Sequence, residues 1–376
     1  MRQNQSLLFV TGTRADFGKI EPLARAAVLH GFEVSFFVTG MHMMHSYGLT
    51  KLEVQRLPDV TVHEFLNQRP GDPQDVILAK TMLGFSDFVV ENKPDLVLVH
   101  GDRVEAMACA LVCATNYIKC AHIEGGEVSG TIDEVFRHCN SKLAYCHFVS
   151  SKSAGKRVQA LGEASDSIHI IGSPELDFHA QPSGFTIDEV RAHYQIDPSD
   201  YGICILHPVT SETNIMEQQA SDLFQALKSS GKYFVVIRPN NDPGSEDIIT
   251  VIDALPKSQF KVIPSMSFGR FSELLKNAAC IVGNSSAGVR EAPFLGVPSL
   301  DVGSRQSARA FGVSITKVDA EKQDEIARFL QQNWHSRHPR QTEFGHGNAT
   351  QKFIDILKSD VFWLRSMQKY FNDFAP

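Results

Sequence analysis

The stretch PDLVLVHGDRVEA (Pro94–Ala106) decides the expected fold, because in it an apolar run meets a glycine and then a cluster of charges. The stretch IKCAHIEGG (Ile118–Gly126) repeats that order a little later. Short apolar runs bounded by turn signals are typical of buried parallel strands. Side chains just past such strands project into the crevice where open α/β sheets bind ligands. The sequence therefore predicts a doubly wound α/β fold with a site at these strand ends.

Strand and helix patterns alternate outward from these two stretches, as is typical of a mostly parallel sheet. In the first part of the chain we expect strands at Leu7–Thr11, Glu33–Val38, Leu96–Val99, Ile118–Ile123, His147–Val149 and Ile168–Ile171. A second alternating set runs from a strand at Gly202–Leu206 to a strand at Ser299–Val302. Segment 172–184, which contains Pro174 and Pro182, breaks the pattern and is the expected linker.

The sequence thus predicts two Rossmann-like, doubly wound parallel-sheet domains that face each other across a cleft. The expected boundaries are 1–173 for the first domain and 174–358 for the second. A C-terminal tail, 359–376, is expected to pack back on the first domain. The length of 376 residues also favours two domains over one.

The composition is that of an ordinary soluble globular protein, with 43% hydrophobic and 21% charged residues. A formal net charge of -7 argues against a nucleic-acid partner. Seven cysteines without a CxxC pair suit reduced thiols in a cytoplasmic protein. The N-terminus carries no signal-peptide pattern and no apolar run reaches the length of a membrane span. We therefore expect a cytoplasmic protein without a membrane partner.

Several acids follow the two predicted strands: Asp102, Glu105, Glu124, Glu127, Asp133 and Glu134. Acids that converge repel one another, which separates their pKa values and therefore their acid and base roles. For any single acid, a solvated loop position or a helix cap is the simpler interpretation. For the set, acid–base chemistry is favoured because strand ends with glycine and acid recur in consecutive units.

The segment TGTRADFGK (Thr11–Lys19) joins the first strand to the first helix and carries two cations, Arg14 and Lys19. Gly12 permits a tight turn there. The string is neither GxGxxG nor a Walker sequence, so it does not support use of a dinucleotide or ATP. Arg14 is expected to reach a phosphate, whereas Lys19 either joins it or lies solvated on the outer face of the helix.

The segment IVGNSSAGVREAP (Ile281–Pro293) predicts a strand, a turn and a helix. The hydroxyls of Ser285 and Ser286, with free N–H groups at the helix start, would form an anion site suited to a diphosphate. Glu291 either accepts bonds from ribose hydroxyls or is a plain exposed glutamate. His207 and Arg305 follow other predicted strands and are expected at the same edge.

Two pairs of histidines have spacings or positions that metal sites use. His42 and His45 are three residues apart, but no third ligand is apparent near them. His100 and His122 could bind a metal with neighbouring acids, although histidines at strand ends commonly bond to backbone. A structural role is favoured for both pairs, and no metal is expected.

Strings from GTRADFGK through HGDR, HIEGGEVSGTIDE, GSPELD, HPVT, PNND and GNSSAGVREAP to DVGSRQ occur in one order along the chain. In these strings the chain resembles the hydrolysing UDP-N-acetylglucosamine 2-epimerases, which make N-acetylmannosamine for bacterial sialic acid synthesis. The resemblance covers nearly the whole chain. It implies a GT-B-like fold with the nucleotide in the cleft and a homo-oligomer, usually a dimer. It implies neither a redox cofactor nor an obligatory metal.

The resemblance also assigns roles to residues. It implies that Asp102, Glu124 and Asp133 are the catalytic carboxylates. His207 would contact the diphosphate and could act as an acid. Gly18 stands where the animal enzymes have serine, so a side-chain contact is absent there. The matching nucleotide-binding positions are Arg14, Arg103, Asn240, Ser285, Ser286, Glu291 and Arg305, together with Ser265 and Met266 in a loop that would face uracil.

The implied reaction requires a base and an acid, which the predicted acid cluster could supply. The substrate's C2 proton is not next to a carbonyl group, so the anomeric C–O bond to UDP must break first or run ahead. The resulting oxocarbenium character acidifies C2, and a carboxylate removes the proton to give 2-acetamidoglucal and UDP. A second acid–base pair then adds water with inversion at C2. Which acid takes which proton stays open.

Other functions fit parts of the same pattern. A close relative acts on a UDP-2,4-diacetamido-2,4,6-trideoxy sugar on the way to legionaminic acid. The non-hydrolysing 2-epimerases return UDP to the other face of the sugar, and release of UDP separates them. A GT-B glycosyltransferase would leave the acid cluster unexplained. A non-catalytic UDP-sugar sensor would bind UDP without turnover.

Overall fold

The fold is seen in a computed structural model, which describes residues 5–128, 132–239, 243–307, 309, 312–370 and 372. The chain forms two compact units. The first comprises Met1–Glu127, Ile132–Ala180 and Glu343–Pro376, and the second comprises Val128–Thr131 and Gln181–Thr342. Among the described residues, no helix has both the length and the apolar character needed to cross a membrane.

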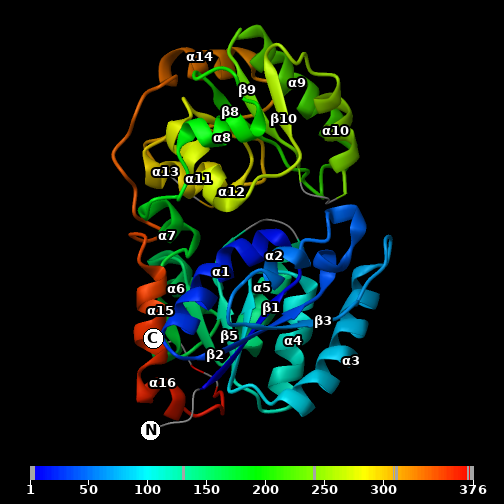
Figure 1. Ribbon diagram of the computed structural model, residues 1–376, viewed down its shortest axis with the longest axis vertical. Helices are drawn as coiled ribbons and strands as arrows, with labels where there is room; N and C mark the ends of the chain where they lie inside the picture. The colour runs from blue at the N-terminus through cyan, green and yellow to red at the C-terminus, as the bar shows by residue number, and fades with distance from the viewer. Residues whose placement is uncertain are drawn as a thin grey trace. The chain divides into compact units, whose positions relative to one another are not determined.

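The first unit is built on a seven-stranded parallel sheet in the order β3-β2-β1-β4-β5-β6-β7 (Figure 1). Its strands are β1 (Ser6–Thr11), β2 (Glu33–Val38), β3 (Thr61–Glu64), β4 (Leu96–His100), β5 (Cys120–Ile123), β6 (Cys146–Val149) and β7 (Ile168–Ile170). The direction of progress along the sheet reverses between β1 and β4. Such a switch point is where open α/β sheets bind ligands.

The second unit repeats this topology with six parallel strands in the order β10-β9-β8-β11-β12-β13. Its strands are β8 (Gly202–Ile205), β9 (Phe234–Ile237), β10 (Phe260–Ile263), β11 (Ile281–Gly283), β12 (Ser299–Val302) and β13 (Ile315–Val318). Its switch point lies between β8 and β11. The predicted fold class, two Rossmann-like parallel-sheet domains, is confirmed.

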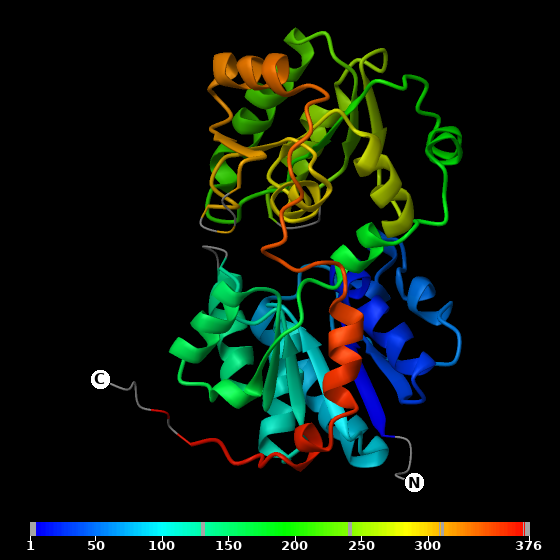
Figure 2. The same ribbon diagram turned by 90° about the vertical axis from the view of Figure 1, so that its left-hand side faces the viewer.

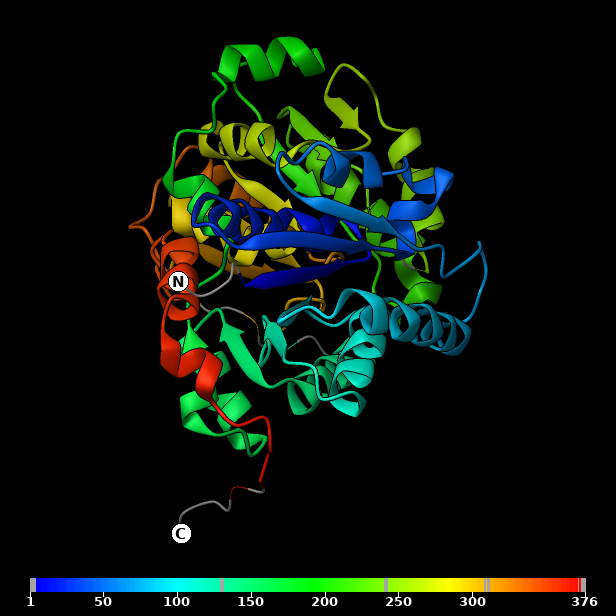
Figure 3. The same ribbon diagram turned by 60° about the horizontal axis from the view of Figure 1, so that its bottom comes forward.

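Helices cover both faces of the first sheet. Those of the first unit are α1 (Arg14–Leu29), α2 (Lys51–Gln55), α3 (Gln74–Asn92), α4 (Val104–Thr115), α5 (Ile132–Leu143), α6 (Lys152–Ala160), α7 (Glu175–Ala180), α15 (Ala349–Leu357) and α16 (Asp360–Leu364). Leu7 and Phe9 of β1 pack against α1 and α15. Leu8 and Val10 pack against α3 and α4, which lie side by side (Figure 3). Burial of both faces explains why the strands are nearly continuous apolar runs.

The helices of the second unit are α8 (Ile187–Tyr194), α9 (Met216–Ser229), α10 (Ser245–Asp253), α11 (Phe268–Asn277), α12 (Ser286–Val289), α13 (Glu291–Leu295) and α14 (Gln323–Asn333). Cys204 of β8 packs toward α9 and α14, whereas Ile203 and Ile205 pack toward α8 and α11. The single helix expected after the turn in the segment Ile281–Pro293 is two short helices, because the chain leaves helical geometry at Arg290 (φ -121°, ψ -58°).

The chain divides differently from the predicted boundaries at 173 and 358. Helix α7 lies inside the expected linker, and α15 belongs to the first unit (Figure 2). Asp177 joins the two helices to each other. Its carboxylate on α7 accepts hydrogen bonds from the backbone N–H groups of Ala349 (2.8 Å) and Thr350 (2.7 Å), at the start of α15. Phe353 and Leu357 of α15 complete the core on one face of the first sheet.

The described part of the predicted tail, 359–370, also belongs to the first unit. Phe362 and Trp363 join the core beside Tyr145, whose hydroxyl donates to the Phe362 carbonyl (2.8 Å). Farther on, the Lys369 ammonium pairs with the buried Glu163 carboxylate at 2.5 Å. The tail is therefore held by both apolar packing and an ion pair to a buried acid.

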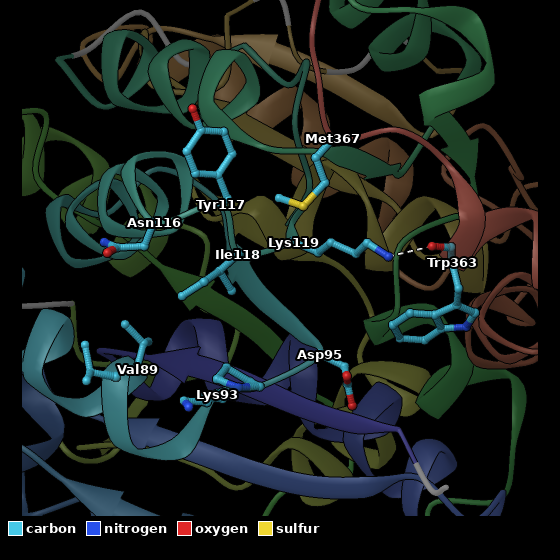
Figure 4. Close-up of a pocket in the computed structure, with 11 residues that line it drawn as sticks. Val89, Lys93, Asp95, Asn116, Tyr117, Ile118, Lys119, Trp363 and Met367 are labelled. Atoms are coloured by element: carbon cyan, nitrogen blue, oxygen red, sulfur yellow. Dashed lines mark hydrogen bonds between the residues drawn. The ribbon is translucent and has the colours of Figure 1, made fainter. Parts of the chain in front are cut away.

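A cavity of about 480 Å³ lies at the amino-terminal end of the first sheet (Figure 4). It is lined by the ends of α3 and α4 and by the tail, including Val89, Tyr117 and Met367. Lys119 donates to the Trp363 carbonyl (2.5 Å) at its wall. This cavity is at the opposite strand ends from the acids.

Candidate active site

The acid cluster begins where β4 and β5 end side by side. His100 and Ile123 are register partners, so the loops that start at Gly101 and Glu124 are neighbours at one sheet edge. Gly101 has φ +67° and Glu124 has φ +62°. A left-handed conformation is easy for glycine but costs a non-glycine residue about 1–3 kcal/mol, and such strain concentrates at functional sites. Glu124 therefore carries backbone strain at the strand end where the acids gather.

Glu124 is a buried carboxylate surrounded by donors. The Lys19 ammonium lies 2.9 Å from its Oε2 and 3.1 Å from its Oε1. The Ser173 hydroxyl donates to Oε1 (3.3 Å), and Nε2 of His100 lies 3.4 Å from Oε2. These contacts hold the carboxylate in one position beside a cation. Glu124 therefore has the fixed position that a general base needs.

Asp102 is held by a second cation. Its carboxylate pairs with the guanidinium of Arg137, a residue of α5 whose side chain is 3% exposed. The Asp102 side chain itself is 25% exposed, so solvent or substrate can reach it. Asp133 lies one turn before Arg137 on α5, and residues four apart share a helix face. Helix α5 thus brings a cation to the end of β4, and Asp133 lies on the same face of that helix.

The loop that carries Asp102 is held in place by two buried side chains, His122 and Asn140. The Gly101 carbonyl accepts hydrogen bonds from His122 Nε2 (2.8 Å) and from Asn140 Nδ2 (3.1 Å). His122 is fully buried, and burial lowers the pKa of its ring to about 3. The neutral ring therefore donates through Nε2, while Nδ1 lies 3.0 Å from the Ser141 hydroxyl. His122 has the backbone-bonding role expected of a strand-end histidine.

Two further cations of the first unit lie near these loops. Arg14 opens α1, and its Nε is 3.1 Å from Glu53 Oε1. Arg103 is the N-cap of α4, with its Nε 3.7 Å from Glu105 Oε2. The two arginine side chains are 29% and 31% exposed, so their charges remain accessible to an anionic ligand.

His42 is a structural residue. Its ring is fully buried, and its nitrogens lie 2.9 Å from the Thr11 hydroxyl and 2.7 Å from the Thr50 hydroxyl. Burial lowers the pKa of this ring. His45 is exposed on a separate turn. Since both ring nitrogens of His42 face hydroxyls, the spacing of the two histidines reflects the turn and no shared ligand.

In the second unit, Asn284 organises the switch point between β8 and β11. Its Oδ1 accepts from the His207 N–H (2.7 Å), and its Nδ2 donates to the His207 carbonyl (2.8 Å). Its own carbonyl accepts from Arg305 Nη1 (3.2 Å) and Gln306 Nε2 (2.8 Å). The sequence placed His207 and Arg305 at this edge, and Asn284 is the residue that ties them to one loop.

Ser285 follows as the N-cap of α12, where its hydroxyl accepts from the Ala287 N–H (3.3 Å). Ser286 is the first residue of that helix, and Glu291, which begins α13, is buried. In the loop after β10, Ser265 is exposed and Met266 is half-buried. Asn240, the remaining predicted nucleotide contact, lies outside the described residues.

Asp301 is a buried acid that the sequence did not single out. It is 2% exposed, and neither carboxylate oxygen has a hydrogen-bond partner among the described residues. Burial raises the pKa of Asp301 to about 6, with Lys317 and Arg305 opposing the shift. Between about pH 4 and pH 6, the folded protein therefore binds a proton here that the unfolded chain, with an ordinary pKa near 3.8, has released.

We expect Asp301→Asn to stabilise the protein more at pH 8 than at pH 5. Stability that depends on the bound proton is present at low pH and is lost as the pH rises from about 4 to about 6. A pKa raised from 3.8 to about 6 corresponds to a loss of about 2–3 kcal/mol of stability, which the amide recovers in full only above that window. Thermal unfolding at both pH values measures the difference. Asp319→Asn, at an exposed position, is the control, and equal changes at both pH values for Asp301→Asn would contradict the assignment.

Two Rossmann-like domains, with cation-held carboxylates at one switch point and a serine-capped turn at the other, define a GT-B-type protein equipped for acid–base chemistry. Residues 26–358 match the sequence model of one family, described as UDP-N-acetylglucosamine 2-epimerase. The chain belongs to the UDP-N-acetylglucosamine 2-epimerase family.

Individual relatives agree with the family match. The chain is 42% identical over 98% of both chains to a UDP-N-acetylglucosamine 2-epimerase of Neisseria meningitidis. It is 31% identical, over 94% of this chain and 96% of the relative, to a UDP-N,N'-diacetylbacillosamine 2-epimerase (hydrolyzing) of Legionella pneumophila. Its fold matches the crystal structure of a UDP-GlcNAc 2-epimerase from Neisseria meningitidis with a TM-score of 0.80, at 19% identity, over 94% and 99% of the two chains.

The sequence missed two contacts that cross long stretches of chain. Lys19 was expected at a phosphate or in solvent, whereas its ammonium bonds to Glu124, 105 residues away. Glu175 lies in the segment taken for a linker, and its carboxylate is 3.7 Å from the same lysine. The string GSPELD (Gly172–Asp177) contains the signal, because an acid directly after proline is typical of a first helical turn.

Proposed function

We propose that the protein is a hydrolysing 2-epimerase that converts UDP-N-acetylglucosamine and water into N-acetylmannosamine and UDP, the first step of sialic acid biosynthesis. The observation that carries the proposal is Glu124, a buried carboxylate in a left-handed conformation beside Lys19. The 42% identity to the Neisseria epimerase supports the choice of substrate.

In the proposed mechanism, Glu124 removes the C2 proton as the anomeric C–O bond to UDP breaks. Elimination gives 2-acetamidoglucal, and an acid–base pair then adds water across its double bond. Asp102 and Asp133 are the proposed pair. Asp102 pairs with Arg137 of α5, and Asp133 lies one turn before Arg137 on the same helix. Such proton transfers contribute about 10²–10⁴-fold each. The reaction is redox-neutral, so it needs no redox cofactor.

The leaving diphosphate needs cationic and dipolar stabilisation. We propose that it is bound by Ser285, Ser286, His207 and the arginines Arg14, Arg103 and Arg305. Glu291 would accept bonds from the ribose, and Asn240 with the loop at Ser265–Met266 would face uracil. On the family resemblance alone, we also propose a homodimer that acts in the cytoplasm.

The second candidate is hydrolysis and epimerisation of UDP-N,N'-diacetylbacillosamine. It is favoured by the 31% identity to the Legionella enzyme, and the groups around C1, C2 and the diphosphate would serve both substrates. The two sugars differ at C4 and C6, so the contacts to those positions would decide between them.

Phosphorus NMR of the purified protein with each UDP-sugar tests the proposal. We expect stoichiometric free UDP from UDP-N-acetylglucosamine, without added metal or acceptor. Formation of UDP-N-acetylmannosamine without UDP would assign the chain to the non-hydrolysing class. Turnover of the diacetamido sugar alone would establish the second candidate, and UDP binding without any turnover would favour a sensor.

A further inference from the structure

Glu175 and Glu124 share one ammonium and one hydroxyl. Glu175 opens α7 and is 2% exposed. Its Oε1 lies 3.7 Å from Lys19 Nζ and 3.1 Å from Ser173 Oγ. The same two groups contact Glu124, at 2.9 Å and 3.3 Å. A serine hydroxyl has a single proton to donate, so at any moment it serves one of the two acids.

This arrangement offers a second acceptor for a proton. The Ser173 hydroxyl joins the two carboxylates, because it lies within hydrogen-bond distance of Oε1 of both. Among the described residues, Nε2 of His100 also lies 3.4 Å from Glu124, and the buried His179 is four residues after Glu175 on α7. A proton that arrives at Glu124 therefore finds a second acceptor one hydroxyl away.

We propose that Glu175 is the proton acceptor behind Glu124, an inference that rests on the proposed function. Once Glu124 has taken the C2 proton, its carboxyl O–H bond breaks and that proton moves to Ser173 Oγ. The Ser173 hydroxyl passes its own proton to Glu175 Oε1. One proton moves in total, Ser173 is regenerated, Glu124 is ionised again and Glu175 becomes neutral.

The transfer has a chemical purpose in an inverting reaction. A base that keeps the proton it removed can return it to the same face of C2, which regenerates the starting configuration. Passing the proton to Glu175 leaves Glu124 unable to do so. C2 is then protonated by another acid, from the opposite face, while the glucal is hydrated.

Glu175→Gln tests the role, because the amide keeps the size of the side chain and an acceptor for Ser173 but does not take up a proton. We expect kcat to fall about tenfold or more, within the range of a lost proton-transfer group, while KM and UDP affinity stay unchanged. Ser173→Ala is expected to lower kcat in the same way. Glu21→Gln, which removes a surface ion pair with Arg25 on α1, is the control.

A structural role for Glu175 predicts a different pattern, in which melting temperature, UDP affinity and kcat fall together. That pattern, or an unchanged kcat in Glu175→Gln, would overturn the inference.

Carbon NMR of glutamate carboxyls gives a readout without substrate. If Ser173 couples the two acids, the carboxyl signals of Glu124 and Glu175 should shift in a common step, over the same pH range, as acid is added. In Ser173→Ala the two signals should shift over different pH ranges. Independent steps in the unmodified protein would overturn the relay even if the proposed reaction is correct, whereas a common step without turnover of any UDP-sugar would refute the proposed function alone.

Discussion

Glu124→Gln is expected to lower kcat by about 10²–10⁴-fold while UDP affinity stays nearly unchanged. Glutamine has the size of glutamate and keeps an acceptor for Lys19, which lies 2.9 Å from the carboxylate. It lacks the basicity to remove a proton from C2. Because the nucleotide is assigned to other residues, loss of the base should not weaken UDP binding.

Steady-state kinetics and calorimetric titration with UDP measure the two effects. Glu91→Gln, the same change at an exposed position of α3, is the matched control and should leave both values intact. If Glu124→Gln loses UDP affinity and turnover equally, Glu124 is a structural or binding residue and the assignment of the base is wrong.

Lys19→Met is expected to lower both stability and turnover. The lysine side chain is 20% exposed, and its partners Glu124 and Glu175 are 7% and 3% exposed. The substitution removes the ammonium that both buried carboxylates contact, and breaking a buried ion pair in this way costs about 3 kcal/mol or more. Turnover should also fall, but less than in Glu124→Gln, because the base is still present and loses only the ammonium that holds it.

Urea unfolding and UDP titration separate this role from phosphate binding. A lysine that binds phosphate would lose UDP affinity on substitution and leave stability intact. Lys19→Arg keeps the charge and should restore most of the stability. A variant Lys19→Met with normal stability and weakened UDP binding would return Lys19 to the phosphate role expected from the sequence.

The apolar strands were predictable because both faces of each sheet are covered. β4 and β5 appear in the sequence as short apolar runs, since no face of them meets water. The edge strands β3 (TVHE) and β13 (ITKV) are only partly buried, and their mixed composition gave no such signal. Helix α7 was missed because Pro174 was taken as a chain breaker, although proline is well tolerated where a helix begins.

The site was predictable to the extent that it depends on strand ends. Asp102 and Glu124 were expected together, and they follow adjacent strands of one sheet. The partners that set their charge come from distant elements: Lys19 from α1 and Arg137 from α5. No spacing in the sequence encodes such pairings, because they depend on how helices pack over the sheet.

The most direct test of the account is proton exchange at C2. The protein would be incubated with UDP-N-acetylglucosamine in D₂O and the sugar followed by proton NMR. Removal of the C2 proton by Glu124 and protonation by another acid predict free UDP and N-acetylmannosamine that carries deuterium at C2. N-acetylmannosamine that retains its original C2 proton would contradict the account, because no carboxylate would have exchanged that proton with solvent.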